Sequence, residues 1–237
     1  MAAVKVVAAA IFGIYAVQIG LYSAGVLELV AAGASFAVVL VGMALWARRN
    51  GWRREELGLR RPAGVFMAAA VFIGVSAWYV DGWIVAMLNP PGDSSKLQEL
   101  VDQTPLVPTL LVLAVLPAMA EELVFRGVLT RMLRTRFAAV HAIGMSAAVF
   151  ALYHLLPPQM VATFCLGLAL GWVTLRANSV IPAMITHALN NAVTIIVSRS
   201  EVPGMTSWMD HHAGTMLIGS TVVLASGLVL VARGAAT

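Results

Sequence analysis

The stretch AMAEELVFRG, residues 118–127, places two adjacent carboxylates and an arginine directly after the apolar run VPTLLVLAVLP, residues 107–117. An apolar run of this kind is typical of a segment that crosses a lipid bilayer. An ionised side chain at the centre of such a helix costs roughly 2.5–3.5 kcal/mol on insertion scales. The three charges at this point of the chain therefore need a structural or a functional explanation.

The composition indicates an integral membrane protein. The chain has 237 residues, of which 60% are hydrophobic and only 11% are charged, whereas soluble domains carry about 25% charged residues. So little charge cannot cover a globular surface. The net charge of +4 does not predict nucleic-acid binding, because the basic residues gather at the ends of apolar runs, as topology signals do. Cys165 has no second cysteine to pair with and is interpreted as a packing residue.

Apolar runs of helical length predict the fold. About twenty apolar residues cross the hydrocarbon core as a helix. We therefore expect an all-α, polytopic transmembrane bundle that forms one domain over residues 1–237, with its active site in the interior, and we interpret the first run as a span rather than a signal peptide. The eight expected spans are 4–22, 26–47, 65–88, 106–128, 138–157, 159–176, 179–198 and 214–232.

The basic residues predict the orientation. Cytoplasmic loops carry an excess of Arg and Lys. With both termini in the cytoplasm, only Lys96 and Arg199 fall outside, while Arg126 lies within a span. The twelve residues on the inner side are then Lys5, Arg48, Arg49, Arg53, Arg54, Arg60, Arg61, Arg131, Arg134, Arg136, Arg176 and Arg233. Since Arg outnumbers Lys and Ala and Val are abundant, we place the chain in a bacterial inner membrane.

Several polar or small residues have ordinary structural interpretations. Asp81 lies among aromatic residues near the outer end of the third span and is expected to reach headgroup water. Gly167 and Gly171 form a GxxxG pattern that indicates close helix packing. Solvated side chains are expected for His141, His211 and His212.

The two glutamates are expected to have different roles. Residues four apart share one face of a helix, so Glu122 and Arg126 can pair, which lowers the cost of burying each charge. Glu121 points elsewhere and is expected to face a cavity. A carboxylate in that position suits general base catalysis.

Two further polar clusters lie inside expected spans. His154 comes late in the fifth span, with Phe150 one turn earlier and prolines 157–158 expected to end the helix. His187 lies in the seventh span, with Asn191 on the same face. One histidine in a helix is usually structural, but ionisable groups on three separate spans indicate function. Straight helices would put His154 nearer the outer face and Glu121 nearer the inner face, so the face toward which the site opens is not assigned.

These segments resemble the motifs of a known family. EELVFR (121–126) is similar to EExxxR, FALYH (150–154) to FxxxH and HALNN (187–191) to HxxxN, in the family's order. The family is CPBP, the intramembrane proteases similar to the type II CAAX prenyl endopeptidase, also called Abi proteins. The resemblance covers about residues 106–198, and the remaining spans carry no matching motif.

The resemblance implies an intramembrane endopeptidase that cuts a membrane-associated protein or peptide. By it, Glu121 is the catalytic base, and the other site residues are His154, His187 and the oxyanion donor Asn191, supported by Glu122, Arg126 and Phe150. The chemistry agrees, because peptide hydrolysis needs an activated water, a proton route to the leaving amine and donors for the oxyanion.

A metal site is the alternative use of the same residues. Glu121, His154 and His187 are the inventory of a catalytic zinc site with three protein ligands. However, Asn191 is a poor zinc ligand and a natural oxyanion donor, and Glu122 is better used by Arg126. We therefore expect no cofactor, with zinc as the alternative.

Other functions remain open at this point. Members of the family are associated with prenylated C-termini, with bacteriocin processing or self-immunity, and with removal of C-terminal sorting helices. We therefore do not infer a CAAX substrate for this chain. Intramembrane Glu and His residues also form proton relays in ion-coupled transporters, although we see no inverted repeat with paired broken spans. A catalytically silent interaction protein is the third alternative.

Overall fold

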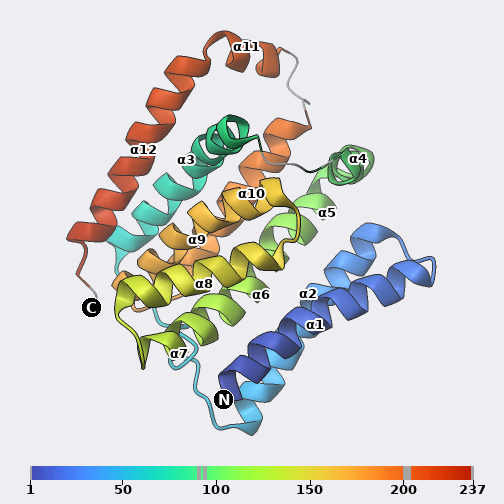
Figure 1. Ribbon diagram of the computed structural model, residues 1–237, viewed down its shortest axis with the longest axis vertical. Coiled ribbons are helices and arrows are strands. Elements are labelled where there is room, and N and C mark those ends of the chain that lie inside the picture. The colour runs from blue at the N-terminus through green and yellow to red at the C-terminus, as the bar shows by residue number, and fades with distance from the viewer. Residues whose placement is uncertain (1, 90–91, 93–94, 200–203, 236–237) are drawn as a thin grey trace.

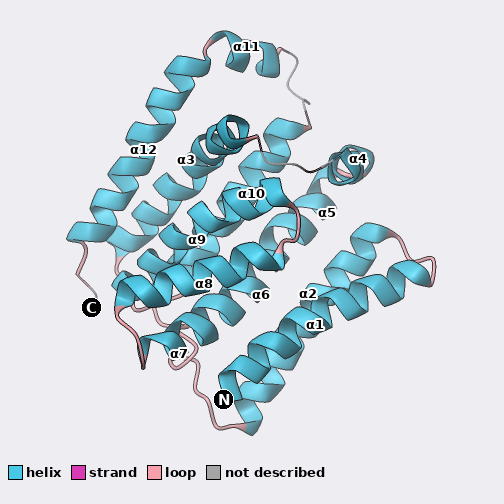
Figure 2. Ribbon diagram, viewed as in Figure 1, coloured by secondary structure: helices cyan, strands magenta, loops and turns pink. Residues whose placement is uncertain are grey.

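The protein is a bundle of helices, shown in Figure 1 as a computed structural model that describes residues 2–89, 92, 95–199 and 204–235. No strand occurs in these residues (Figure 2), which confirms the all-α bundle. The helices are α1 (Ala2–Ser23), α2 (Glu28–Arg49), α3 (Gly64–Leu88), α4 (Ser95–Gln103), α5 (Leu106–Leu110), α6 (Leu116–Glu122), α7 (Arg131–Arg134), α8 (Ala139–Tyr153), α9 (Pro157–Ala177), α10 (Ile181–Ser198), α11 (Met205–His211) and α12 (Ala213–Arg233), and two π-helical turns are η1 (Leu111–Val115) and η2 (Leu123–Thr130).

Seven helices of the described part are long and apolar enough to cross a membrane. The remaining expected span, the fifth at 138–157, is a shorter apolar helix, α8, of 15 residues. Its predicted end was wrong. The helix stops before His154, Leu155 takes a left-handed backbone conformation (φ 61°), and prolines 157–158 begin α9. Proline fits there because the first helical residues have no N–H partner to lose.

The fourth span is longer than expected, since it runs without a break from Leu106 to Arg134. Two π-helical turns, η1 and η2, flank the α6 segment that carries the two glutamates. The Thr130 hydroxyl donates to the Phe125 carbonyl five residues earlier, at 2.9 Å, across η2. π-Helical turns inside a longer helix are common at functional sites. The α8 end lies beside this segment, since Tyr153, next to His154, donates to Glu121.

The helices pack mainly in two groups (Figure 1). The hairpin of α1 and α2 packs on α6, η2 and α8 through one apolar cluster, and α3, α9, α10 and α12 pack together through others. Both termini and the loop 50–63 lie at one end of the bundle, and α4 and α11 lie at the other. Large apolar side chains such as Phe12, Val41 and Ile218 stay exposed, as a lipid-facing surface requires.

The GxxxG pattern has the packing role that the sequence predicts. A Cβ on Gly167 would lie 3.1 Å from the Ala147 Cβ, and one on Gly171 would lie 3.0 Å from Ile143 Cγ2. Both glycines thus let α9 approach α8 closely. This approach places the Gly167 carbonyl beside the site.

Candidate active site

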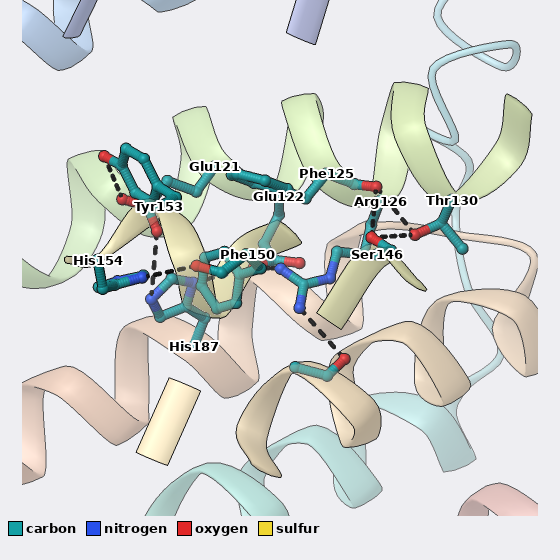
Figure 3. A network of polar contacts seen from close by, with 11 residues as sticks. Glu121, Glu122, Phe125, Arg126, Thr130, Ser146, Phe150, Tyr153, His154 and His187 are labelled. Atoms are coloured by element: carbon teal, nitrogen blue, oxygen red, sulfur yellow. Dashed lines mark hydrogen bonds and ion pairs between the residues drawn. The ribbon is translucent and has the colours of Figure 1, made fainter. Parts of the chain in front are cut away.

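A fully buried ion pair forms the base of the site (Figure 3). Arg126 Nη1 donates to Glu122 Oε1 at 2.8 Å, so the pairing expected from the i, i+4 spacing is confirmed. Arg126 Nη2 also donates to the Gly167 carbonyl at 3.2 Å, and the guanidinium lies 4.4 Å from the centre of the Phe150 ring. These contacts offset part of the desolvation cost of the buried arginine.

His187 joins this pair from another helix. Its Nδ1 lies 3.0 Å from Glu122 Oε1, the oxygen that Arg126 also uses. Because the carboxylate paired with arginine is an acceptor, the imidazole donates from Nδ1 and keeps its Nε2 lone pair. That Nε2 faces Glu121, with 3.9 Å to Oε2. Glu122 therefore orients His187 in addition to holding Arg126.

Glu121 is 3% exposed and lies between two helices. Its Oε1 accepts a hydrogen bond of 3.2 Å from the Tyr153 hydroxyl of α8 (Figure 3). Its Oε2 has no hydrogen-bond partner in the described part of the protein. One carboxylate oxygen is thus held in place and the other is available to a ligand beside His187.

His154 follows α8 and contributes a second imidazole. Its Nδ1 lies 2.8 Å from the Phe150 carbonyl, which can only accept, so this nitrogen carries the proton. The ring packs edge-on against Phe150 at 4.9 Å between centroids, and Phe150 packs in the same way against His187 at 5.8 Å. Phe150 therefore holds the two imidazoles and the Arg126 guanidinium around one aromatic ring.

Asn191 lies one turn beyond His187 on α10. Its Nδ2 donates to the Leu113 carbonyl of η1 at 3.2 Å, which uses one of its two N–H groups. The second N–H is available to a ligand. Asn190 beside it also lines the site, and its buried Oδ1 has no partner in the described residues.

One cavity of about 580 Å³ brings the predicted residues together. Glu121, His154, His187 and Asn191 all line it, from three separate spans. The α1–α2 hairpin covers one side, where Tyr15 also donates from its hydroxyl to the Tyr153 carbonyl. From His187 the lining continues along α10 to Ser198 and under α4, so the cavity extends toward the α4 end of the bundle.

Comparison with known proteins agrees with the motifs. Residues 103–193 match the family model described as type II CAAX prenyl endopeptidase Rce1-like. This segment of the chain is thus similar to the Rce1-like family. Comparison with the curated proteins and comparison with the solved structures gave no match. The resemblance to the CPBP family is thus confirmed, and the family implies a peptidase that is integral to the membrane.

The zinc alternative concerns Glu121, His154 and His187 of the Rce1-like segment. Within the described residues, no three His, Cys, Asp or Glu side chains come close enough together to hold a metal ion. His187 and His154 use their Nδ1 atoms on Glu122 and on the Phe150 carbonyl, which leaves each Nε2 lone pair free, as in histidines that bind a metal. The choice between a general base and a zinc site therefore stays a prediction.

Three features of the structure differ from or add to the sequence predictions. Asp81 does not reach headgroup water: it is only 7% exposed and lines the same cavity, so that interpretation was wrong. Tyr153 and Tyr15 were missed, although Tyr153 stands beside His154 within FALYH. Only the crossing of α8 and α6 reveals its contact with Glu121. The three histidines expected to be solvated, His141, His211 and His212, are exposed.

Proposed function

We propose that the protein is an intramembrane endopeptidase that hydrolyses a peptide bond of a membrane-associated protein or peptide, with water activated by Glu121. The observation that carries the proposal is the convergence of Glu121, His154 and His187 from separate helices on one cavity. Glu121 and His187 are each 3% exposed. A site buried in this way excludes bulk water, which strengthens each electrostatic contact inside it.

The attacking water is held between Glu121 and His187 in this proposal. Glu121 Oε2 is without a partner in the described structure and lies 3.9 Å from His187 Nε2, a separation at which one water bonds to both atoms. Both atoms accept hydrogen bonds, so they orient the water oxygen toward a substrate carbonyl. Glu121 takes the proton as the C–O bond forms.

The remaining groups serve the tetrahedral intermediate and its collapse. The Asn191 N–H that Leu113 does not use donates to the oxyanion. His154 keeps an Nε2 lone pair, because its Nδ1–H is committed to Phe150. It carries the proton from Glu121 to the leaving amine as the C–N bond breaks, so the step ends with a carboxylic acid and an amine.

The cavity geometry supports a proposal for the side from which substrate enters. The lining extends to the α4 end and includes none of the basic residues of the loops at the other end. Because basic loops favour the cytoplasm, we place both termini inside and the substrate entrance on the outer side of a bacterial inner membrane. Prenylation is not part of the proposal.

The test compares the C-termini of membrane and secreted proteins in cells that carry wild-type protein, Glu121→Gln or Glu99→Gln. Glu99 is an exposed carboxylate of α4 and serves as the matched control. We expect some C-termini to be present in wild-type and Glu99→Gln cells and absent from Glu121→Gln cells. The proposal is wrong if no C-terminus depends on Glu121, or if purified wild-type protein cleaves the precursors of the Glu121-dependent products no faster than Glu121→Gln does.

A further inference from the structure

One buried carboxylate in the cavity has no role in the mechanism above. Asp81 of α3 is 7% exposed and lines the active-site cavity. It also lines a second cavity of about 410 Å³ between α3, α9 and α12, whose other lining residues, such as Leu166, Trp172 and Leu224, are almost all apolar. Asp81 thus lies in the wall between the active-site cavity and an apolar space.

No group of the described protein neutralises or hydrogen-bonds the Asp81 carboxylate. The nearby donors are directed elsewhere. The Trp78 indole donates to the Val75 carbonyl and the Tyr79 hydroxyl to the Ala213 carbonyl. A carboxylate that is mostly withdrawn from water and has no counter-charge is costly to ionise. Such a group persists where a ligand completes it.

The charge of the cavity identifies that ligand as a cation. Its lining contains the carboxyl groups of Asp81 and Glu121 but no lysine or arginine. Glu121 has His187 and Tyr153 as partners, whereas Asp81 has none among the described residues. A cationic group that entered the cavity would therefore be attracted chiefly to Asp81, and an ion pair formed away from water is strongly favourable relative to one unpaired charge.

We propose that Asp81 is a specificity-determining residue that binds a basic group of the substrate, either a Lys or Arg side chain or a free α-amine. The inference rests on the proposed peptidase function. Asp81 and Glu121 line the same cavity from two helices of one packed bundle, so the distance between them is fixed. The basic group of a bound peptide therefore lies at a fixed number of residues from the scissile bond. A neutral residue at that position leaves the carboxylate buried and unpaired, which selects against it.

Binding is measured first, without hydrolysis, on full-length Glu121→Gln protein in lipid nanodiscs. The probes are N-acetylated, C-amidated Ala/Leu heptapeptides that carry one lysine at each position in turn, and the same series with norleucine. We expect lysine at one position to tighten binding by at least about tenfold. A norleucine peptide with a free N-terminus distinguishes an α-amine from a side chain as the bound group.

The variants then assign the effect to Asp81. Adding Asp81→Asn to Glu121→Gln is expected to abolish the lysine preference, whereas adding Glu99→Gln or Asp81→Glu is expected to retain it. Equal binding of all lysine, norleucine and free-amine probes by the Glu121→Gln protein overturns the inference. A lysine preference that survives Asp81→Asn overturns it too. If Asp81→Asn does not accumulate, the comparison of probes on the Glu121→Gln protein still decides.

Cleavage by the otherwise wild-type protein separates this inference from the proposed function. Asp81→Asn is expected to raise KM for the preferred lysine peptide by about tenfold or more and to leave KM for its norleucine counterpart unchanged. If no peptide is cleaved but the Asp81-dependent binding preference is found, the peptidase proposal fails and the cation subsite stands. If peptides are cleaved with no preference for a basic group, the peptidase proposal stands and the cation subsite fails.

Discussion

His187 Nδ1 lies 3.0 Å from Glu122 Oε1, and Arg126 Nη1 lies 2.8 Å from the same oxygen. One carboxylate oxygen therefore links the segment that carries the glutamates to α10. It also sets the His187 tautomer, because Nδ1 must donate and Nε2 then accepts toward Glu121. A buried carboxylate that orients a histidine in this way recurs in catalytic sites that use a histidine base.

Glu122 and Arg126 are expected to affect folding as well as activity. Glu122→Ala and Arg126→Ala each leave a buried charge without its partner, at a cost of about 3–5 kcal/mol. Both should lower membrane accumulation and the melting temperature, while Glu121→Gln should change neither. The double variant should lose less than the sum of the two single losses, since it leaves neither charge unpaired. Additive losses would show that the pair does not stabilise the fold.

Tyr153→Phe is expected to reduce activity without unfolding the protein. The change removes the hydroxyl that donates to Glu121 Oε1 but keeps the aromatic ring, which packs on Phe125 and His154. A hydrogen bond to an ionised group contributes about 1.5–3 kcal/mol, so kcat should fall by roughly ten- to a hundredfold. Tyr79→Phe is the control, because the Tyr79 hydroxyl bonds to Ala213 outside the site. Equal kcat values for the two variants would contradict the prediction.

Gly167→Ala is expected to loosen the contact between α9 and α8. The added Cβ would lie 3.1 Å from the Ala147 Cβ and 3.2 Å from Arg126 Nη2, so α9 must shift. Overpacking of this kind costs about 1–3 kcal/mol, to be measured as a lower melting temperature. Gly144→Ala on α8 is the matched control. Nothing lies within 4 Å of its added Cβ, and alanine favours the helix by up to about 1 kcal/mol. If Gly167→Ala melted at or above the Gly144→Ala temperature, the close approach would not be required.

Activity is expected to survive removal of metal ions. Purified protein dialysed exhaustively against a strong chelator should keep its cleavage rate and contain no stoichiometric zinc by elemental analysis, because Glu121 with His187 suffices to activate water in the proposed mechanism. Loss of activity with the chelator, restored by up to one equivalent of zinc, would instead make Glu121, His154 and His187 ligands.

The orientation is tested with single cysteines in a Cys165→Ala background. Cysteines at Ser95 and Ser207 should react with an impermeant thiol reagent in intact spheroplasts, and one at Asn50 should not. All three positions are exposed in the structure, so burial does not account for a difference. Labelling at Asn50 alone would reverse the orientation and move the substrate entrance to the cytoplasmic side.

The sequence by itself determined the fold class, the spans and the local pairing. Hydrophobic length predicts a membrane helix because the bilayer has a fixed thickness. The i, i+4 spacing predicts that Glu122 and Arg126 pair because that contact lies within one helix. The three motifs in their order indicated the family that residues 103–193 match. Each of these inferences depends on neighbours along the chain or on the membrane.

Only the tertiary structure decided how the helices meet. The contact of Tyr153 with Glu121, the sharing of Glu122 between Arg126 and His187, and the burial of Asp81 in the cavity wall all join residues far apart in the chain. Helix ends were also misjudged, because the fourth span continues through η2 and α7 to Arg134 and α8 ends before His154. Composition cannot predict such contacts: they depend on helix crossings and on small residues such as Gly167, where packing sets which side chains face one another.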